Sequence, residues 1–195
     1  AIDLGAGCGF QSIPLAQLGF TVTAIDLDRK LLTELLAHAG DAAIDVVHDD
    51  LRDFDSHVTK PVELIVCMVD TLTHLDTKDA VIALLAKVYA ALEPGGRFIV
   101  TYRDLSHELT ELDRFIPVRS DADTVFTCFL EYEPETVKVH DLVHRRRADS
   151  WQLLKSFYRK LRLPRRWVVD QLASAGFAPV NATVEQGFVT IVADR

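Results

Sequence analysis

A glycine-rich turn near the start of the chain has the clearest chemical meaning. The run 3–9, DLGAGCG, follows a short apolar segment and holds three of the nine glycines of the sequence. Glycine reaches backbone angles closed to other residues and lets the main chain approach a ligand closely. A helix expected over residues 11–18 would then offer its N-terminal amides to that ligand. This order of strand, turn and helix predicts a site for a nucleotide-like cofactor.

The spacing of the glycines separates two classes of cofactor. Dinucleotide-binding turns carry G-x-G-x-x-G, in which the third glycine lets helix and strand approach each other. Here the glycines are Gly5, Gly7 and Gly9, and Phe10 stands where the dinucleotide pattern has its third small residue. This spacing disfavours a nicotinamide oxidoreductase. A glycine turn that binds nothing is the alternative, and the later strands decide between the two.

An acidic residue ends the second expected strand, residues 21–25. Asp26 stands about 20 residues after the turn, where a βαβ unit places an acid on the ribose hydroxyls of its ligand. Leu27 follows it directly. Asp28 is interpreted as the N-cap of a helix over 29–39, because its side chain can accept from free first-turn amides. A solvated strand end is the alternative for Asp26.

Further landmarks continue the alternation of strands and helices. A third strand, expected over 43–47, leads into two consecutive acids. A fourth apolar strand, over 62–69, also ends at an acid, and a helix over 78–92 follows it. The turn LEPGGR, at 92–97, then opens a fifth strand. These landmarks in order are more specific than any one of them alone.

Together, DLGAGCG, the acids after the second and third strands, and LEPGGRFIV resemble the class I S-adenosylmethionine-dependent methyltransferases. The resemblance is strong over residues 1–103 and weaker over 164–195. It implies S-adenosyl-L-methionine as cofactor, with Asp50 accepting from the adenine amine, Leu51 packing on the ring, and Asp49 as the register alternative to Asp50. The cofactor-binding residues expected on this basis are Asp3, Gly5, Ala6, Gly7, Gly9, Asp26, Leu27, Asp50, Leu51 and Met68.

The resemblance also implies the fold. We expect an α/β, Rossmann-like methyltransferase fold, with a mostly parallel seven-stranded sheet, an antiparallel C-terminal strand and a β insertion. One methyltransferase domain would span residues 1–195, with its core in 1–103 and 164–195 and its insertion in 104–163. Residue 1 already lies inside the first strand, so we expect that strand to be truncated at its N-terminus and a further segment to precede it.

Consecutive strands replace the alternation inside the insertion. Residues 124–132 are rich in β-branched and aromatic residues, 137–143 alternate with period two, and 151–163 form a third expected strand. Residues 104–123 are expected to form a loop with a helical turn. The architecture resembles small-molecule N-methyltransferases, including amino-sugar N,N-dimethyltransferases and glycine/sarcosine-type enzymes. In those enzymes the insertion covers the active-site mouth and often builds a dimer, so we expect a homodimer through it.

The reacting groups should follow the fourth and fifth strands, because open parallel sheets bind ligands at the carboxyl ends of their strands. The residues expected to line the methyl-transfer site are Asp70, Thr71, His74, Tyr102 and Arg103. His74 is the first choice for general base or substrate orienter, since histidine titrates near working pH; a loop residue that caps the next helix is the alternative. Asp70 would hold a substrate ammonium or serve as a turn residue. Tyr102 would orient an amine or pack as a core aromatic. His74, Asp70 and Tyr102 are therefore the expected catalytic residues.

Charge and cysteines limit the partners. Residues 1–100 carry 15 acidic and 7 basic residues, and the net charge of −8 opposes binding to polyanions. Nine Lys and Arg in 145–166 could still bind phosphates, although a solvated strand face that balances the acidic residues of 121–135 is the preferred interpretation. No apolar run approaches the roughly 18 residues that span a bilayer. The three scattered cysteines indicate no zinc site and a reducing cytoplasm.

The sequence thus predicts a cytoplasmic S-adenosylmethionine-dependent methyltransferase that acts on a nitrogen or oxygen of a small molecule, without metal or membrane partner. Nucleic acid is disfavoured as a partner. The fourth strand is not followed by [DN]-P-P-[YF], the segment of DNA amino-methyltransferases, and no Pro-Cys pair offers a C5-cytosine nucleophile. Two alternatives stay open: an RNA methyltransferase that uses 145–166, and a fold relative that binds the cofactor without catalysis.

Overall fold

The structure is a computed structural model that describes residues 1–185 and 187–195, and it divides into two compact units. The first unit comprises residues 1–104 and 165–195. Its strands are β1 (Ile2–Leu4), β2 (Val22–Asp26), β3 (Ile44–His48), β4 (Val62–Cys67), β5 (Leu92–Arg103), β10 (Val180–Glu185) and β11 (Phe188–Asp194). Its helices are α1 (Ser12–Gln17), α2 (Arg29–Ala39), α3 (Lys78–Ala91) and α4 (Arg165–Ala175), with short 3-10 helices η1 (Leu51–His57) and η2 (Thr71–His74).

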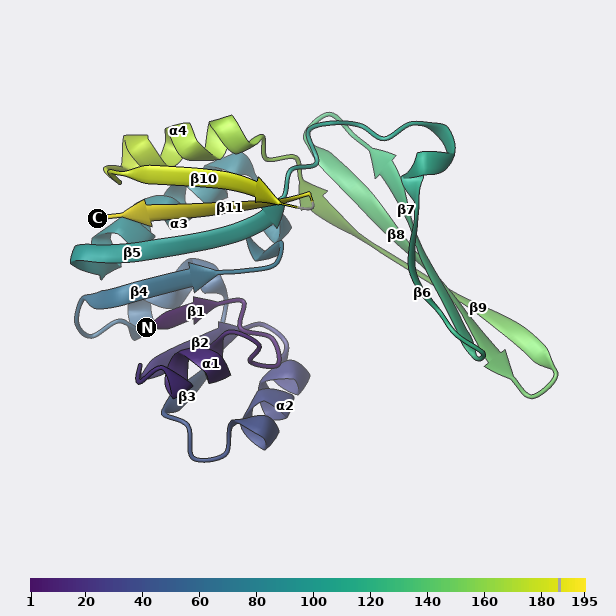
Figure 1. The fold of residues 1–195 in the computed structure, drawn as a ribbon, viewed down its shortest axis with the longest axis horizontal. Coiled ribbons are helices and arrows are strands. Elements are labelled where there is room, and N and C mark those ends of the chain that lie inside the picture. The colour runs from purple at the N-terminus through teal and green to yellow at the C-terminus, as the bar shows by residue number, and fades with distance from the viewer. Residues whose placement is uncertain (186) are drawn as a thin grey trace. The chain divides into compact units, whose positions relative to one another are not determined.

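The seven strands form one sheet in the order β10-β11-β5-β4-β1-β2-β3 (Figure 1). β1 pairs in parallel with β2 on one side and β4 on the other, so Ile2 lies opposite both Thr23 and Ile65. β11 runs antiparallel to β5 and β10. This confirms the expected mostly parallel sheet with an antiparallel C-terminal strand. The strand order reverses at β1, and such a switch point is where an open α/β sheet binds its ligand.

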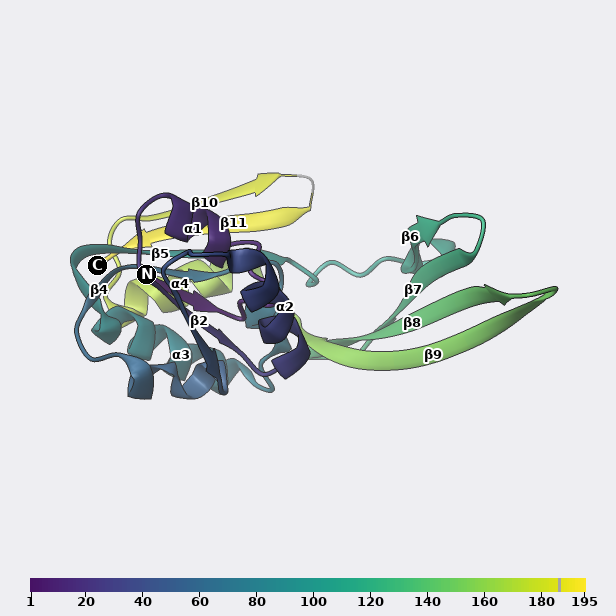
Figure 2. The same cartoon turned by 90° about the horizontal axis from the view of Figure 1, so that it is seen from below.

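Helices cover both faces of the sheet. α1 and α2 contact β2 and β3, while α3 and α4 contact each other and the β5–β11 side; α1 and α3 lie on opposite faces (Figure 2). α2 buries Leu32 and Leu35 and begins at Asp28, whose carboxylate accepts from the amides of Lys30 and Leu31 at 2.8 and 3.4 Å. The expected N-cap is therefore confirmed. No helix within the described residues is long and apolar enough to cross a membrane.

The second unit, residues 105–164, is an antiparallel sheet of four strands in the order β6-β7-β8-β9. They are β6 (Phe115–Ser120), β7 (Thr124–Tyr132), β8 (Thr136–Arg147) and β9 (Ser150–Leu161), preceded by the 3-10 helix η3 (Glu111–Arg114). The expectation of a loop with a helical turn over 104–123 was wrong for β6. That strand contains Pro117 and Arg119 and leaves all six residues exposed, so the sequence lacks the apolar alternation that marks a half-buried strand.

The two faces of this sheet differ. Leu130, Val137 and Val139 form a small core on one face, covered by Leu105 and Leu109 from the segment before β6. On the other face, cross-strand pairing aligns Phe115, Phe129, His140 and Phe157 in one row over all four strands. Successive ring centroids in this row lie 4.7, 5.7 and 6.0 Å apart. We call these four residues the ring row.

Candidate cofactor pocket and reacting groups

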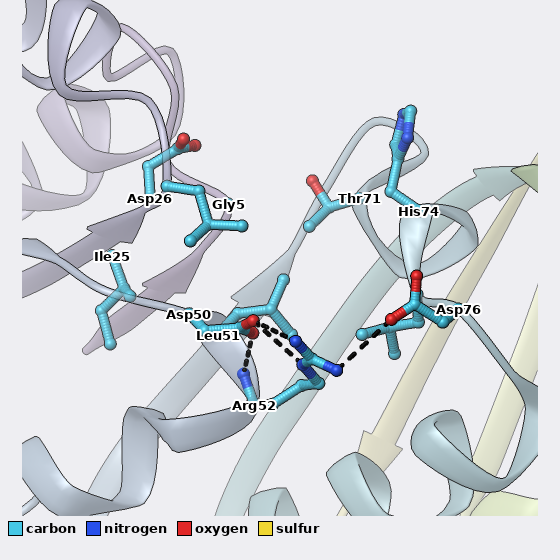
Figure 3. Close-up of a pocket in the computed structure, with 11 residues that line it drawn as sticks. Gly5, Ile25, Asp26, Asp50, Leu51, Arg52, Thr71, His74 and Asp76 are labelled. Atoms are coloured by element: carbon cyan, nitrogen blue, oxygen red, sulfur yellow. Dashed lines mark hydrogen bonds and ion pairs between the residues drawn. The ribbon is translucent and has the colours of Figure 1, made fainter. Parts of the chain in front are cut away.

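A pocket of about 300 Å³ opens at the carboxyl ends of β1, β2, β3 and β4, at the switch point of the sheet (Figure 3). The residues that follow the parallel strands of the first unit meet at this edge of the sheet, which is where open α/β sheets bind their ligands. Six of the expected site residues line it. The full lining is Gly5, Ile25, Asp26, Leu27, Asp50, Leu51, Arg52, Thr71, His74, Leu75 and Asp76.

The glycine turn closes one wall of the pocket tightly. The amides of Gly5 and Ala6 both donate to the carbonyl of Ile25, at 2.9 and 3.0 Å, which ties the turn to β2. Gly5 has a φ of +77°, and a Cβ there would lie 2.6 Å from the Thr71 Oγ1. Glycine is needed at this position for backbone angle and for space. Gly9 has a different role, because a Cβ there would lie 2.7 Å from Leu35 of α2.

Asp26 is held in a fixed orientation at the end of β2. Its Oδ2 accepts from the amide of Gly7 and its Oδ1 from the amide of Asp28, both at 2.8 Å. An ionised carboxylate offers about four acceptor positions, so two remain after these bonds. The side chain borders the pocket, on the side opposite His74 (Figure 3). Asp26 can therefore accept a pair of ligand hydroxyls without giving up its backbone partners.

Asp50 and Leu51 form the wall that follows β3. The Asp50 carboxylate caps η1 and also forms an ion pair with Arg52, and both residues line the pocket. Arg52 holds the pKa of Asp50 below its ordinary value, mainly through their side-chain hydrogen bonds. Asp49, the register alternative, does not line the pocket and pairs with His57 at 2.8 Å.

The other expected cofactor residues lie outside the lining of the pocket. Asp3 is 1% exposed and accepts from the Ser12 hydroxyl at 2.6 Å, which joins β1 to α1. Burial raises the pKa of Asp3 to about 6. Ala6 is buried in the turn, and the Met68 sulfur lies 3.9 Å from the hydroxyl of Thr101. Neither these residues nor Gly7 and Gly9 are among the lining residues.

Two consecutive residues after β4 have left-handed backbone angles. Val69 and Asp70 have φ values of 51° and 69°, a conformation that costs a non-glycine residue about 1–3 kcal/mol and that clusters at functional sites. The segment is tied to β5, because the Val69 amide donates to the Thr101 hydroxyl at 2.8 Å and the Asp70 amide to the Thr101 carbonyl at 3.1 Å. β5 therefore fixes where this turn directs its side chains.

The Asp70 carboxylate is bound by Arg103, and the sequence, which places both residues at the site, did not predict this pairing. It accepts from the backbone amide of Arg103 at 2.7 Å and also from its guanidinium, which stacks 4.3 Å from the centre of the Phe188 ring. Asp70 is 2% exposed. A substrate ammonium would have to share this carboxylate with Arg103.

His74 and Tyr102 have contrasting surroundings. His74 ends η2, is exposed and lines the pocket. Tyr102 is entirely buried, and among the described residues its hydroxyl has no hydrogen-bond partner. Burial raises the pKa of this phenol, so it stays neutral. Of the two roles that the sequence left open for Tyr102, the structure shows the buried aromatic of the core.

The pocket residues fit an S-adenosyl group by chemistry and space. The turn has no space for a side chain at Gly5, so the amino-acid chain of the ligand can lie close to the backbone there. The Asp26 carboxylate keeps two acceptor positions after its two backbone hydrogen bonds, which suits the hydroxyls of a ribose. Leu51 and Leu75 supply an apolar surface for a flat base. Within the described chain, no three His, Cys, Asp or Glu side chains are grouped to hold a metal ion.

Sequence reasoning missed several residues of the pocket wall. Thr71 is not among them, because the sequence places it at the site directly after the fourth strand. Arg52 and Asp76 carried no signal, because charged residues in loops usually face solvent, and only the fold shows that they contact each other at 3.4 Å.

The fold and pocket define a class I methyltransferase architecture, and comparisons with known proteins agree. Residues 1–96 match the family model "Methyltransferase domain". A glycine/sarcosine N-methyltransferase of Aphanothece halophytica is 29% identical over 112 residues, which are 56% of this chain and 42% of that protein. The chain thus spans less than half the length of that relative.

Two solved structures share the fold. The CcbJ methyltransferase from Streptomyces caelestis matches with a TM-score of 0.84 at 21% identity, over 98% of this chain and 81% of that one. S-adenosylmethionine-bound CalS10, an amino pentose methyltransferase from Micromonospora echinaspora, matches with a TM-score of 0.78 at 17% identity, over 100% and 82%. Residues 1–96 thus match a methyltransferase domain, and the chain shares the fold of S-adenosylmethionine-dependent methyltransferases, one of which was solved with S-adenosylmethionine bound.

Proposed function

We propose that this protein transfers a methyl group from S-adenosylmethionine to a nitrogen or oxygen atom of a small molecule. The observation that carries the proposal is the Asp26 carboxylate, fixed by two backbone amides at the wall of a pocket whose opposite side carries His74. When bound, the cofactor supplies a methyl group on a sulfonium leaving group. The protein must then chiefly hold the acceptor in line, which is catalysis by proximity and orientation.

Within this proposal His74 takes the proton of the methyl acceptor or orients it. Its imidazole is exposed at the pocket, and a general base must lie within hydrogen-bond reach of the proton that it removes. Asp70 shapes the turn that leads to His74 and holds Arg103, so we give it a positioning role. Tyr102 is not placed in contact with substrate, because its hydroxyl is interior.

The contacts of the basic segment 145–166 favour a small methyl acceptor over RNA. Arg159 forms a two-pronged contact with Glu133 at 2.9 and 3.0 Å, and Arg162 pairs with Glu108 at 2.7 Å. Lys160 is 8% exposed. A part of the 145–166 cluster is therefore used inside its own sheet, and fewer cations are left for phosphates.

One labelling experiment tests the proposal against its alternatives. The full chain is incubated with methyl-labelled S-adenosylmethionine and either a small-metabolite extract or total RNA, and label is followed into each fraction, with Asp26→Ala as the inactive control. Label in small molecules supports the proposal. Label in RNA alone would establish the RNA alternative, and binding of S-adenosylhomocysteine without transfer to any fraction would indicate a cofactor-binding relative.

We further propose a cytoplasmic homodimer formed through the ring row. Phe115 and Phe157 are 46% and 56% exposed at the two ends of this continuous aromatic surface. Exposed aromatic side chains that gather on one face mark interaction sites. A second copy offers the same surface, as two-fold interfaces require. Cysteines at 8, 67 and 128, far apart in the sequence, accord with a reducing compartment.

A further inference from the structure

The guanidinium of Arg52 joins two acidic residues that come from different segments of the pocket wall (Figure 3). Its Nε and Nη2 donate to Oδ2 of Asp50 at 3.0 and 2.6 Å, and its Nη1 donates to Oδ2 of Asp76 at 3.4 Å. Asp50 follows β3, whereas Asp76 follows η2. Arg52 therefore links the wall supplied by β3 to the wall supplied by β4.

These contacts leave the Asp50 carboxylate little freedom. Oδ2 receives two side-chain N–H groups, and Oδ1 receives the backbone amide of Arg52 at 2.9 Å. Each carboxylate oxygen accepts about two hydrogen bonds. Within the described part of the chain, one acceptor position on Oδ1 thus stays available. Three hydrogen bonds to one neighbour also fix the rotation of the carboxylate.

We propose that Arg52 is a positioning residue that sets the base specificity of the pocket, by holding Asp50 so that its Oδ1 accepts one N–H from an amino-substituted purine. This inference rests on the proposed function, because it takes the S-adenosyl group as the ligand. A carboxylate can only accept hydrogen bonds, so it attracts an exocyclic amine and repels an oxo group at the same place. Arg52 is turned toward Asp50 and Asp76 and does not present its fork to the base.

The charges around Asp50 support this division of roles. Asp49 is tied to His57, so it does not compete for Arg52. Asp76 is exposed and contacts Arg52 only at its far end, 3.4 Å away. Asp53 adds a weaker attraction to Arg52. Arg52 also keeps Asp50 ionised into the acid range, since it lowers the pKa of that carboxyl group.

Calorimetric titration of the full chain tests the inference with two ligands that differ only in the base. S-adenosylhomocysteine carries the amine, and S-inosylhomocysteine carries an oxo group in its place. The variants are Arg52→Ala, Arg52→Lys and Asp76→Asn. Arg166→Ala is the matched control, because its side chain is 93% exposed and reaches Asp170 only at 3.9 Å.

The native chain should prefer the adenosyl ligand strongly. Arg52→Ala should lower its affinity for that ligand by about tenfold, the scale of a lost charged hydrogen bond, and narrow the preference over the inosyl ligand. The affinity of Arg52→Lys should lie between those of the native chain and Arg52→Ala, because an ammonium group cannot form the two parallel hydrogen bonds of a guanidinium. Binding by Arg52→Ala should also fail at a higher pH than native binding as the solution is acidified, because the Asp50 pKa is no longer depressed.

The outcomes separate this inference from the proposed function. A native chain that binds neither ligand overturns both. If the native chain binds, and Arg52→Ala shows the same affinity, the same preference between the two ligands and the same dependence on pH, the inference is overturned and the proposed function stands. If Arg52→Ala loses the same affinity for both ligands, and its binding fails at the same acidic pH as that of the native chain, Arg52 is merely structural. This result also overturns the inference. Circular dichroism establishes that each variant is folded, and Arg52→Lys serves as the readout if the alanine variant is not.

Discussion

The Asp26 carboxylate accepts a hydrogen bond of 2.8 Å from the backbone amide of Gly7, 19 residues earlier in the chain. The second oxygen accepts from the amide of Asp28, also at 2.8 Å. These two bonds couple the glycine turn to the end of β2. An acid and a turn that are distant in sequence thereby form one rigid wall of the pocket.

Asp26→Ala should weaken binding of S-adenosylhomocysteine far more than Asp28→Ala. Asp26 loses hydrogen bonds to a charged acceptor, which contribute roughly 1.5–3 kcal/mol each, and it also releases the turn. Asp28 should lose only helix-cap stability, about 1 kcal/mol, because its carboxylate faces the amides of α2. Calorimetry measures the affinities, and thermal denaturation measures the cap. Equal affinity losses would mean that Asp26 does not contact the ligand.

Asp3 should make the stability of the protein fall as pH rises. Its folded pKa of about 6 lies above the ordinary 3.8, so folding favours the protonated form. Ionisation of buried Asp3 therefore lowers the free energy of unfolding. This loss of stability is absent below pH 3.8, grows up to about pH 6 and then stays constant. Its upper size is about 3 kcal/mol, from the pKa difference.

Thermal denaturation across this range, compared between the native chain and Asp3→Asn, isolates that contribution, because all other acids titrate in both proteins. The melting temperature of Asp3→Asn relative to native should increase from acid to neutral pH. A difference that stays constant with pH would show that the Asp3 pKa is not raised.

The strands and helices of the first unit and its glycine turn followed from short-range signals, and the family resemblance then implied the sheet and the cofactor. Apolar strands, an N-cap at Asp28 and the glycine turn act within a few residues, so the sequence displays them directly. β6 escaped because its pairing with β7 is a non-local contact, made by exposed residues without alternation. Such strands depend on their partners and not on their own composition.

The pocket shows the same division. Asp26 ends β2 and was placed by the spacing of the βαβ unit, whereas Asp50 follows β3 and was placed by the family resemblance. The engagement of Asp70 by Arg103, and the link from Arg52 to Asp76, arise from residues 33 and 24 positions apart. Local patterning carries no information on which charged partners will meet across a fold. The same limit left Tyr102 undecided, since burial depends on what packs over the strand end.

Tyr102→Phe should keep or raise stability and leave methyl transfer unchanged. The hydroxyl is buried without a hydrogen-bond partner among the described residues, and an unsatisfied buried polar group costs about 1–3 kcal/mol. Removing the oxygen relieves that cost and leaves the ring in place. Chemical denaturation gives the stability change. A turnover loss of more than about tenfold with native cofactor affinity would instead place the hydroxyl on the acceptor.

His74→Ala should lower turnover on the true acceptor by roughly 10²–10⁴ if the imidazole is a general base. Affinity for S-adenosylhomocysteine should stay within a few-fold, because Asp26 and Asp50 hold the opposite walls of the pocket. His38→Ala, an exposed histidine on α2, is the matched control. A pH-independent and smaller loss would indicate that His74 only orients the substrate. Native turnover across about pH 6–9 would remove it from the mechanism.

Phe157→Ser should weaken self-association of the chain. Phe157 ends the ring row and is 56% exposed, so a second copy would bury aromatic surface there. Leu36→Ser is the matched control, because Leu36 is 55% exposed on α2, outside the sheet. Analytical ultracentrifugation should show a dimer whose dissociation constant rises at least about tenfold in Phe157→Ser and not in Leu36→Ser. A monomeric native chain, or equal effects of the two substitutions, would refute an interface through the ring row.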